Sequence, residues 1–143
     1  MAQLTLNKAN QIIKTALAKG AEAGMKPLSV SVLDAGGHLQ AFQRQDGASM
    51  LRFQIATGKA FGALALGVGS RAVEKIAKDR PHFFDGLSGV SDGRIVPVTG
   101  GVLIRDTKGK ILGAVGVTGD TSDNDEIAAV AGITAAGFVA DGG

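Results

Sequence analysis

The N-terminal part of the chain has a helical period of apolar side chains. Between residues 5 and 24, small or apolar residues recur every three or four positions, at Leu6, Ala9, Ile13, Ala16, Leu17, Gly20 and Gly24. This spacing is typical of one face of a helix. Thr5 is a candidate N-cap, and Gly24 followed by Pro27 is typical of a helix end. The pattern predicts an amphipathic helix over residues 5–24.

Two segments have the period of two that is typical of β-strands. Apolar residues alternate with serines over residues 28–34, a turn signal follows at 34–37, and the chain returns as a second strand over 39–44. Further along, apolar residues 102–104 and 111–117 flank a turn in which Gly109 suits the positive-φ position. Each pair of strands predicts a β-hairpin.

Three more helices are predicted between and after the hairpins. Residues 50–67 are rich in Ala and Gly, which indicates close backbone packing against a sheet or another subunit, because glycine otherwise destabilises a helix by about 1 kcal/mol. A short helix over 70–78 follows, with Ser70 as its candidate N-cap. The last helix spans about 123–140, with a capping box from Ser122 and Asp125 or from Asp123 and Glu126.

Residues 79–99 show little periodicity. An irregular segment of this length in a small domain is either functional or a plain surface connection. The remaining element order, one helix, a hairpin, two helices, a second hairpin and a helix, predicts an α+β fold or a three-layer α/β/α sandwich with an antiparallel sheet. With 143 residues, we expect one domain over 1–143.

Composition and charge exclude several classes of function. The chain contains no Cys, Trp or Tyr and only 6 Phe, which argues against disulfides, thiol chemistry and stacking on single-stranded nucleic acid. Its net charge is +2 and its basic residues are scattered, so we expect no nucleic-acid partner. No signal peptide or apolar run of membrane-spanning length is evident, and we expect a cytoplasmic protein without a membrane partner.

The candidate anion-binding residues are Lys59, Arg94, Gly100 and Gly101. Lys59 lies among the small residues of the second helix, where it either extends to solvent or holds a ligand carboxylate, with Arg52 in support. The paired glycines at 100 and 101 free backbone N–H groups for an anion, and Arg94 adds a charged donor. The alternative is that these glycines form a bulge at the start of a strand.

The chain contains two histidines, His38 and His82. Neither has a partner at the spacing of a zinc site, but haem iron needs only one or two axial ligands. The alternative is a surface or capping role for each. Acidic residues, among them Glu126, lie between the last strand and the last helix, where they stabilise a helix N-terminus or provide a cation site or a general base.

Taken together, the motifs resemble the GlcG/HbpS-like family, which includes the C-terminal domain of PduO proteins. The resemblance covers nearly the whole chain and rests on residues 4–13, 32–39, 55–60, 70–72, 93–106, 113–119 and 125–126. It implies a profilin-like fold with helices on both faces of a five-stranded antiparallel sheet. Residues 94–98 would supply the fifth strand. It also implies a homo-oligomer, and some members bind haem.

Three functions follow as hypotheses. In the first, the protein binds haem or a related tetrapyrrole, with His38 or His82 on the iron and Lys59 or Arg94 on the propionates. In the second, it is an enzyme for a small carboxylate or carbonyl compound, in which Lys59 and Arg94 hold the acid, His38 or Glu126 moves a proton, and residues 79–94 close the pocket. In the third, it is an oligomeric accessory scaffold.

Overall fold

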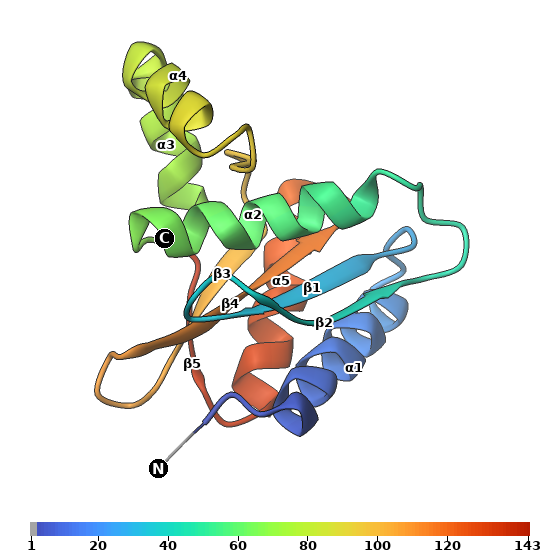
Figure 1. Ribbon diagram of the computed structural model, residues 1–143. Coiled ribbons are helices and arrows are strands. Elements are labelled where there is room, and N and C mark those ends of the chain that lie inside the picture. Colours follow the sequence, from blue (N-terminus) through green and yellow to red (C-terminus); the bar gives the residue numbers. More distant parts are fainter. Residues whose placement is uncertain (1–2) are drawn as a thin grey trace.

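The computed structural model describes residues 3–143, and its helices and strands form three layers (Figure 1). In chain order the elements are α1 (Leu6–Glu22), β1 (Ser29–Asp34), β2 (Leu39–Arg44), α2 (Arg52–Leu66), α3 (Ser70–Asp79), α4 (Pro81–Val90), β3 (Gly101–Arg105), β4 (Ile111–Thr118), α5 (Ser122–Ala135) and β5 (Val139–Asp141). None of the helices in residues 3–143 combines the length and the apolar character of a membrane span.

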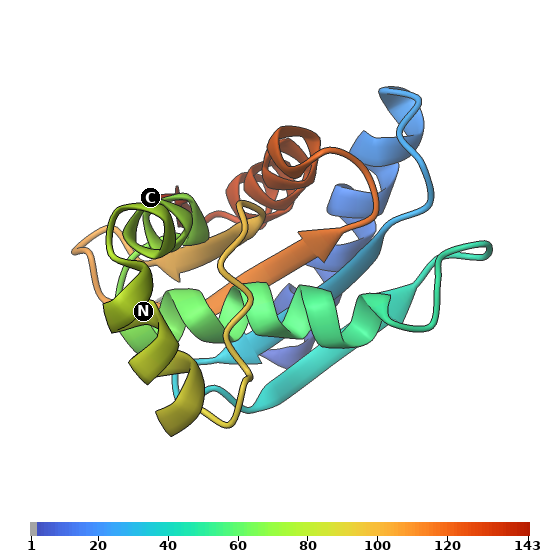
Figure 2. The same ribbon diagram turned by 90° about the horizontal axis from the view of Figure 1, so that it is seen from above.

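The five strands form one antiparallel sheet with the order β2-β1-β4-β3-β5. Helices α1 and α5 lie side by side on one face, and α2 covers the other (Figures 1 and 2). Both predicted hairpins are present, and Gly109 in the second has a φ of +86°. The expected α+β fold with a five-stranded antiparallel sheet is therefore confirmed.

The fifth strand is not the expected one. Residues 94–98 do not join the sheet. They cross α2 instead, where the Val96 N–H donates to the Gly58 carbonyl over 3.2 Å and Ile95 is 6% exposed. The fifth strand is β5, which lies in the segment predicted as the end of the last helix. Helix α5 ends at Ala135 because Gly137, with a φ of +90°, turns the chain back to pair with β3.

Three other predictions about the helices were wrong. Ser70 is not the N-cap of α3 but its first residue, and the N-cap is Gly69. Residues 81–90 form helix α4 rather than irregular chain, since Pro81 suits a first helical turn. The N-cap of α5 is Thr121, whose hydroxyl accepts the Asn124 N–H over 3.2 Å, so Ser122 and Asp123 lie inside the helix. By contrast, the Thr5 N-cap of α1 is confirmed, because its hydroxyl accepts the Lys8 N–H over 3.2 Å.

The two faces of the sheet differ in the size of their side chains. Large apolar residues face α1 and α5: Val30, Val32, Val102, Ile104, Val115 and Val117. The face toward α2 combines Leu33 and Leu103 with small residues, and two of these are the cross-strand neighbours Gly101 and Gly116. A Cβ atom at Gly116 would overlap the Ala56 carbonyl oxygen, and one at Gly101 would overlap the Lys59 carbonyl oxygen. The backbone of α2 therefore lies directly on the sheet.

Because of this close approach, we predict that a methyl group added at Gly116 lowers stability, whereas one added at an open glycine does not. The Gly116→Ala change should lower the free energy of unfolding by about 1–3 kcal/mol, since overpacking displaces α2. Gly86→Ala on α4 is the matched control, because no atom lies within 4 Å of the added Cβ, and it should stabilise the helix by up to about 1 kcal/mol. Urea unfolding measures both, and equal effects would contradict the close approach.

Candidate functional site

An apolar cleft of about 500 Å³ opens between α2, the β1–β2 hairpin and the segment 93–96. Its walls include two aromatic rings, Phe53 and Phe61, and the aliphatic side chains of Leu39, Leu51 and Val96. Leu39 and Leu51 remain 52% and 57% exposed. Small-molecule sites typically have volumes of about 300–1,000 Å³ and mostly apolar walls with a few polar groups. This cleft has both properties.

Arg94 is the one charged residue among those that line the cleft. Its guanidinium lies over the Phe61 ring, 4.3 Å from the ring centroid, and its Nε–H donates to the Ser91 carbonyl over 2.9 Å. The stacking and the hydrogen bond fix the plane of the guanidinium at the edge of the cleft. Its terminal amino groups are then available to bind an anionic group of a ligand.

His38 lies between two cleft residues, Gly37 and Leu39, but its ring lines a neighbouring hollow that also contains Lys110. The Nδ1 atom is 3.2 Å from Oδ1 of Asp34, and the side chain is 81% exposed. Backbone N–H groups of His38 and Gly36 also donate to that oxygen, and they lower the pKa of the Asp34 carboxyl. Asp34 therefore contacts the His38 ring at Nδ1, and Nε2 on the other side of the ring remains exposed to solvent.

His82 lies on α4, where its side chain is exposed, and it does not line the cleft. The structure thus keeps the two histidines on separate elements. Among residues 3–143, no group of three or more His, Cys, Asp or Glu side chains is arranged to hold a metal ion.

Lys59 is buried rather than extended to solvent, with 2% of the residue exposed. Its ammonium donates to Asp125 Oδ2 over 3.1 Å and to the Val117 carbonyl over 2.9 Å. Burial lowers the pKa of Lys59 and raises that of Asp125, while the attraction between the two charges opposes both shifts. The carboxylate that Lys59 holds therefore belongs to its own chain.

The predicted glycine pair lies beside this ion pair. A Cβ atom at Gly100 would be 2.9 Å from Lys59 Nζ, and the Gly101 N–H donates to the Ser70 hydroxyl. Arg52 points to the same end of the sheet, where it donates to the Thr118 hydroxyl over 2.7 Å. The structure brings Lys59, Gly100 and Gly101 together, as the sequence suggested. Protein atoms fill the space between them, so no room is left for a bound anion.

Glu126 binds Arg71 at the surface, with an Arg71 Nη2 to Oε1 distance of 3.2 Å, and Asp123 binds the same guanidinium. These carboxylates raise the pKa of Arg71. Asp120 links the segment before β1 to the start of α5, because its carboxylate accepts hydrogen bonds from the Lys26 N–H and the Asn124 side-chain amide. These two bonds, together with one from the Thr121 N–H, lower the pKa of Asp120 to about 2. The acidic cluster thus forms structural contacts.

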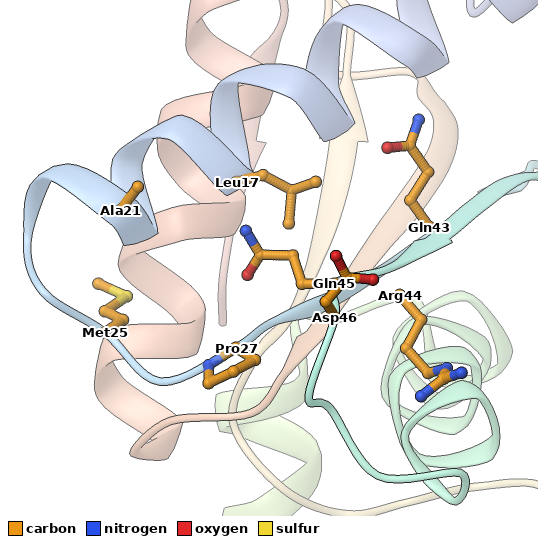
Figure 3. Close-up of a pocket in the computed structure, with 8 residues that line it drawn as sticks. All are labelled: Leu17, Ala21, Met25, Pro27, Gln43, Arg44, Gln45 and Asp46. Atoms are coloured by element: carbon orange, nitrogen blue, oxygen red, sulfur yellow. The ribbon is translucent and has the colours of Figure 1, made fainter.

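A further hollow of about 520 Å³ lies between the end of α1 and the edge strand β2, and Figure 3 shows its lining. Its walls combine Leu17, Met25 and Pro27 with the polar side chains of residues 43–46. None of the residues proposed from the sequence lies in it.

Sequence reasoning missed most of the cleft. Phe61 and Leu51 were part of a predicted helix, and Leu39 was part of a predicted strand, but none was proposed as a site residue. One signal was present: Met50 and Leu51 are large apolar residues at the start of a helix, where polar caps are usual, and both are exposed.

A protein-family model described as "Haem degrading protein HbpS-like" matches residues 4–134. The chain belongs to the HbpS-like family. The resemblance seen in the sequence motifs is confirmed. A curated relative of this HbpS-like chain is an uncharacterised 15.0 kDa protein from the dhaT-dhaS intergenic region of Citrobacter freundii. It is 33% identical over 129 residues, which cover 90% of this chain and 89% of the relative.

Solved structures resemble this HbpS-like chain over nearly its full length. The ORFY protein of Klebsiella pneumoniae has a TM-score of 0.84 at 27% identity, with 95% of this chain and 92% of that chain covered. HbpS has a TM-score of 0.81 at 26% identity, with 94% and 91% covered. A PduOC:heme complex has a TM-score of 0.84 at 22% identity, with 96% and 97% covered, and shares the fold.

The buried ion pair of this HbpS-like chain should show strong coupling in unfolding experiments. Lys59→Met or Asp125→Asn alone should cost about 3–5 kcal/mol, because each leaves a buried charge without its partner. The double variant should cost less than the sum of the two, since it removes both charges.

The exposed pair of Lys75 and Asp79, whose side chains are 76% and 55% exposed, is the matched control. The Lys75→Met and Asp79→Asn changes should each alter stability by less than about 1 kcal/mol. Additive costs for Lys59→Met and Asp125→Asn in urea unfolding would contradict a coupled buried pair.

Proposed function

We propose that this protein binds haem in the apolar cleft and acts as an accessory protein rather than a catalyst. The observation that carries the proposal is the cleft itself, about 500 Å³ of mostly apolar space with Arg94 as its one charged lining residue. A flat, largely apolar macrocycle with carboxylates at one edge matches a cleft with apolar walls and a cation at one edge.

Two kinds of relatives support haem as the ligand. The family is described as haem-degrading and HbpS-like, and a chain of the same fold has been solved as a haem complex. The cleft of this chain offers what haem needs from its walls: Phe53 and Phe61 can contact the ring, and Arg94 can pair with the propionates.

His38 is our candidate for the iron ligand. It is flanked by the cleft residues Gly37 and Leu39, whereas His82 lies on α4. Reaching the cleft requires the His38 ring to turn away from Asp34, which breaks one hydrogen bond at the surface. An exposed hydrogen bond of this kind contributes only about 0.5–1.5 kcal/mol. Coordination of the iron by His38 would offset the loss of this bond.

Four residues expected to bind ligand or to catalyse have no part in this proposal. Lys59, Gly100 and Gly101 surround the buried ion pair with Asp125, and Glu126 is held by Arg71. A small acid held between Lys59 and Arg94 would have to displace Asp125 from Lys59. The enzyme hypothesis is therefore not carried forward.

Titration of the purified protein with hemin, followed by the Soret band, tests the proposal. We expect saturable binding at one haem per chain. Arg94→Gln should weaken the binding by about tenfold, in line with about 1.5–3 kcal/mol for a charge-assisted hydrogen bond. His38→Ala should remove the spectral signature of histidine coordination, and His82→Ala should leave both unchanged.

Arg80→Gln is the matched control, because Arg80 stacks on Phe83 outside the cleft at 4.2 Å from the ring centroid. It should bind hemin like the unaltered protein. Unsaturable binding, or equal weakening by Arg80→Gln and Arg94→Gln, would count against haem in the cleft. A spectral change with His82→Ala instead of His38→Ala would overturn the assignment of the iron ligand.

A further inference from the structure

The strap, defined as residues 93–98, crosses α2 and forms one wall of the cleft (Figure 2). It belongs to no helix or strand. Within residues 3–143, a single backbone hydrogen bond joins the stretch 95–98 to another element, from the Val96 N–H to the Gly58 carbonyl. The other two walls, α2 and the β1–β2 hairpin, are hydrogen-bonded along their length. The strap is therefore the wall that separates most easily.

Both ends of the strap are fixed. The Gly93 N–H donates to a carbonyl of α4 over 2.7 Å, and after the strap the Thr99 N–H donates to Glu74 Oε1 over 3.0 Å. Next to each fixed point the backbone has a positive φ, +56° at Asp92 and +69° at Gly93 on one side, and +125° at Gly100 on the other. Hinges are a few loop residues that absorb changes in φ and ψ, and glycine does so without steric strain.

The strap covers a part of α2 that has no side chains. Gly58 and Gly62 lie one helical turn apart beneath it, where an added Cβ atom would overlap the side chain of Val96 or of Ile95. When the strap lifts, the apolar floor of the cleft therefore extends along α2 from Gly58 to Gly62. A helix surface without side chains accepts a flat ring, because the ring can approach the backbone closely.

Arg94 connects the strap with the ligand. Its guanidinium lies 4.3 Å from the centroid of the Phe61 ring, which attaches the strap to α2 at the edge of the cleft. Arg94 is also the one charged residue that lines the cleft. A ligand carboxylate that pairs with Arg94 therefore binds to the strap itself and holds it closed over the ligand.

We propose that the strap is the movable wall of the cleft. It swings away from α2 on hinges at residues 92–93 and at Gly100 while the three layers stay folded, and it closes when Arg94 meets the carboxylate of the ligand. That this ligand is haem rests on the proposed function, whereas the movement of the strap rests on its own contacts.

Hydrogen exchange in the ligand-free protein, followed by NMR, tests the movement. The Val96 N–H should exchange through opening of the strap alone, so its rate should depend little on urea. The Ala60 N–H, which is buried in α2, should exchange only on global unfolding and depend steeply on urea. Equal urea dependence of the two amides would overturn the proposal, because the strap would then open only together with α2.

The Gly58→Ala change should force the strap open. The added Cβ atom would overlap the Val96 side chain and lie 2.9 Å from the Arg94 carbonyl oxygen, so the Val96 N–H should exchange about tenfold faster or more. Gly86→Ala on α4 is the matched control, since its methyl group enters open space, and it should leave that rate unchanged. Equal exchange rates in the two variants would count against the strap.

A disulfide between residues 62 and 95 should lock the strap, and the chain has no Cys of its own. A Cβ atom at Gly62 would lie 3.7 Å from Ile95 Cβ, within the range of about 3.5–4.5 Å that disulfides need. In the Gly62→Cys/Ile95→Cys variant the strap is fixed when oxidised and free when reduced, so the reduced form is the matched control.

The binding probe is gallium protoporphyrin IX, a haem analogue that the reductant leaves unchanged. By stopped-flow fluorescence, it should associate with the oxidised variant about tenfold more slowly, or worse, than with the reduced variant. Equal rates would overturn the strap as the entrance to the cleft. If the analogue binds neither this variant nor the unaltered protein, the haem proposal fails, and the exchange of the Val96 N–H still decides whether the strap moves.

Discussion

The backbone of α2 lies directly on the sheet, and the positions of the other elements depend on this contact. Gly101 and Gly116 are neighbours on adjacent strands, and at each a Cβ atom would overlap a carbonyl oxygen of α2. The approach brings Lys59 to the end of the sheet, where its ammonium reaches Asp125 at the start of α5. One ion pair thus joins the two helical layers, and its isolation from water makes each charge depend on the other.

The same close packing forms the cleft. Gly58 and Gly62 of α2 leave room for Val96 and Ile95, whose segment crosses the helix instead of joining the sheet. This crossing places Arg94 over Phe61 and forms one wall of the cleft, while the β1–β2 hairpin forms another. The small residues of α2, which indicated close backbone packing in the sequence, therefore serve both the sheet and the crossing segment.

The sequence predicted those elements that are determined by neighbouring residues in the chain. The hairpins follow from alternation and turn residues, and the α1 N-cap follows from Thr5. The last strand was missed because β5 has only three residues and continues an apolar run after α5. Helix α4 was missed because Gly86 and Gly89 interrupt its pattern. The burial of Lys59 depends on Asp125, 66 residues away, and nothing near Lys59 in the sequence signals that partner.

In the candidate site, too, the sequence predicted some residues and missed those whose role depends on tertiary packing. Arg94, which lines the cleft, and His38, whose ring lines the neighbouring hollow, were identified from the sequence, because charged and imidazole side chains are visible in any sequence. The apolar walls were not, since a leucine or phenylalanine that lines a cleft has the same local pattern as one in a core. Whether such a residue remains exposed is decided by tertiary packing, here by the path of residues 93–96 over α2.

The most direct test of the account is to locate the bound ring on the protein. Backbone ¹H–¹⁵N correlation spectra would be recorded with and without gallium protoporphyrin IX, a diamagnetic analogue of haem. We predict that the largest shifts fall on Gly37, Gly58 and Gly93, which line the cleft. Shifts confined to Gly36 and Lys110 beside the His38 ring, or to Met25 and Gln45 in the hollow of Figure 3, with the cleft unchanged, would contradict it.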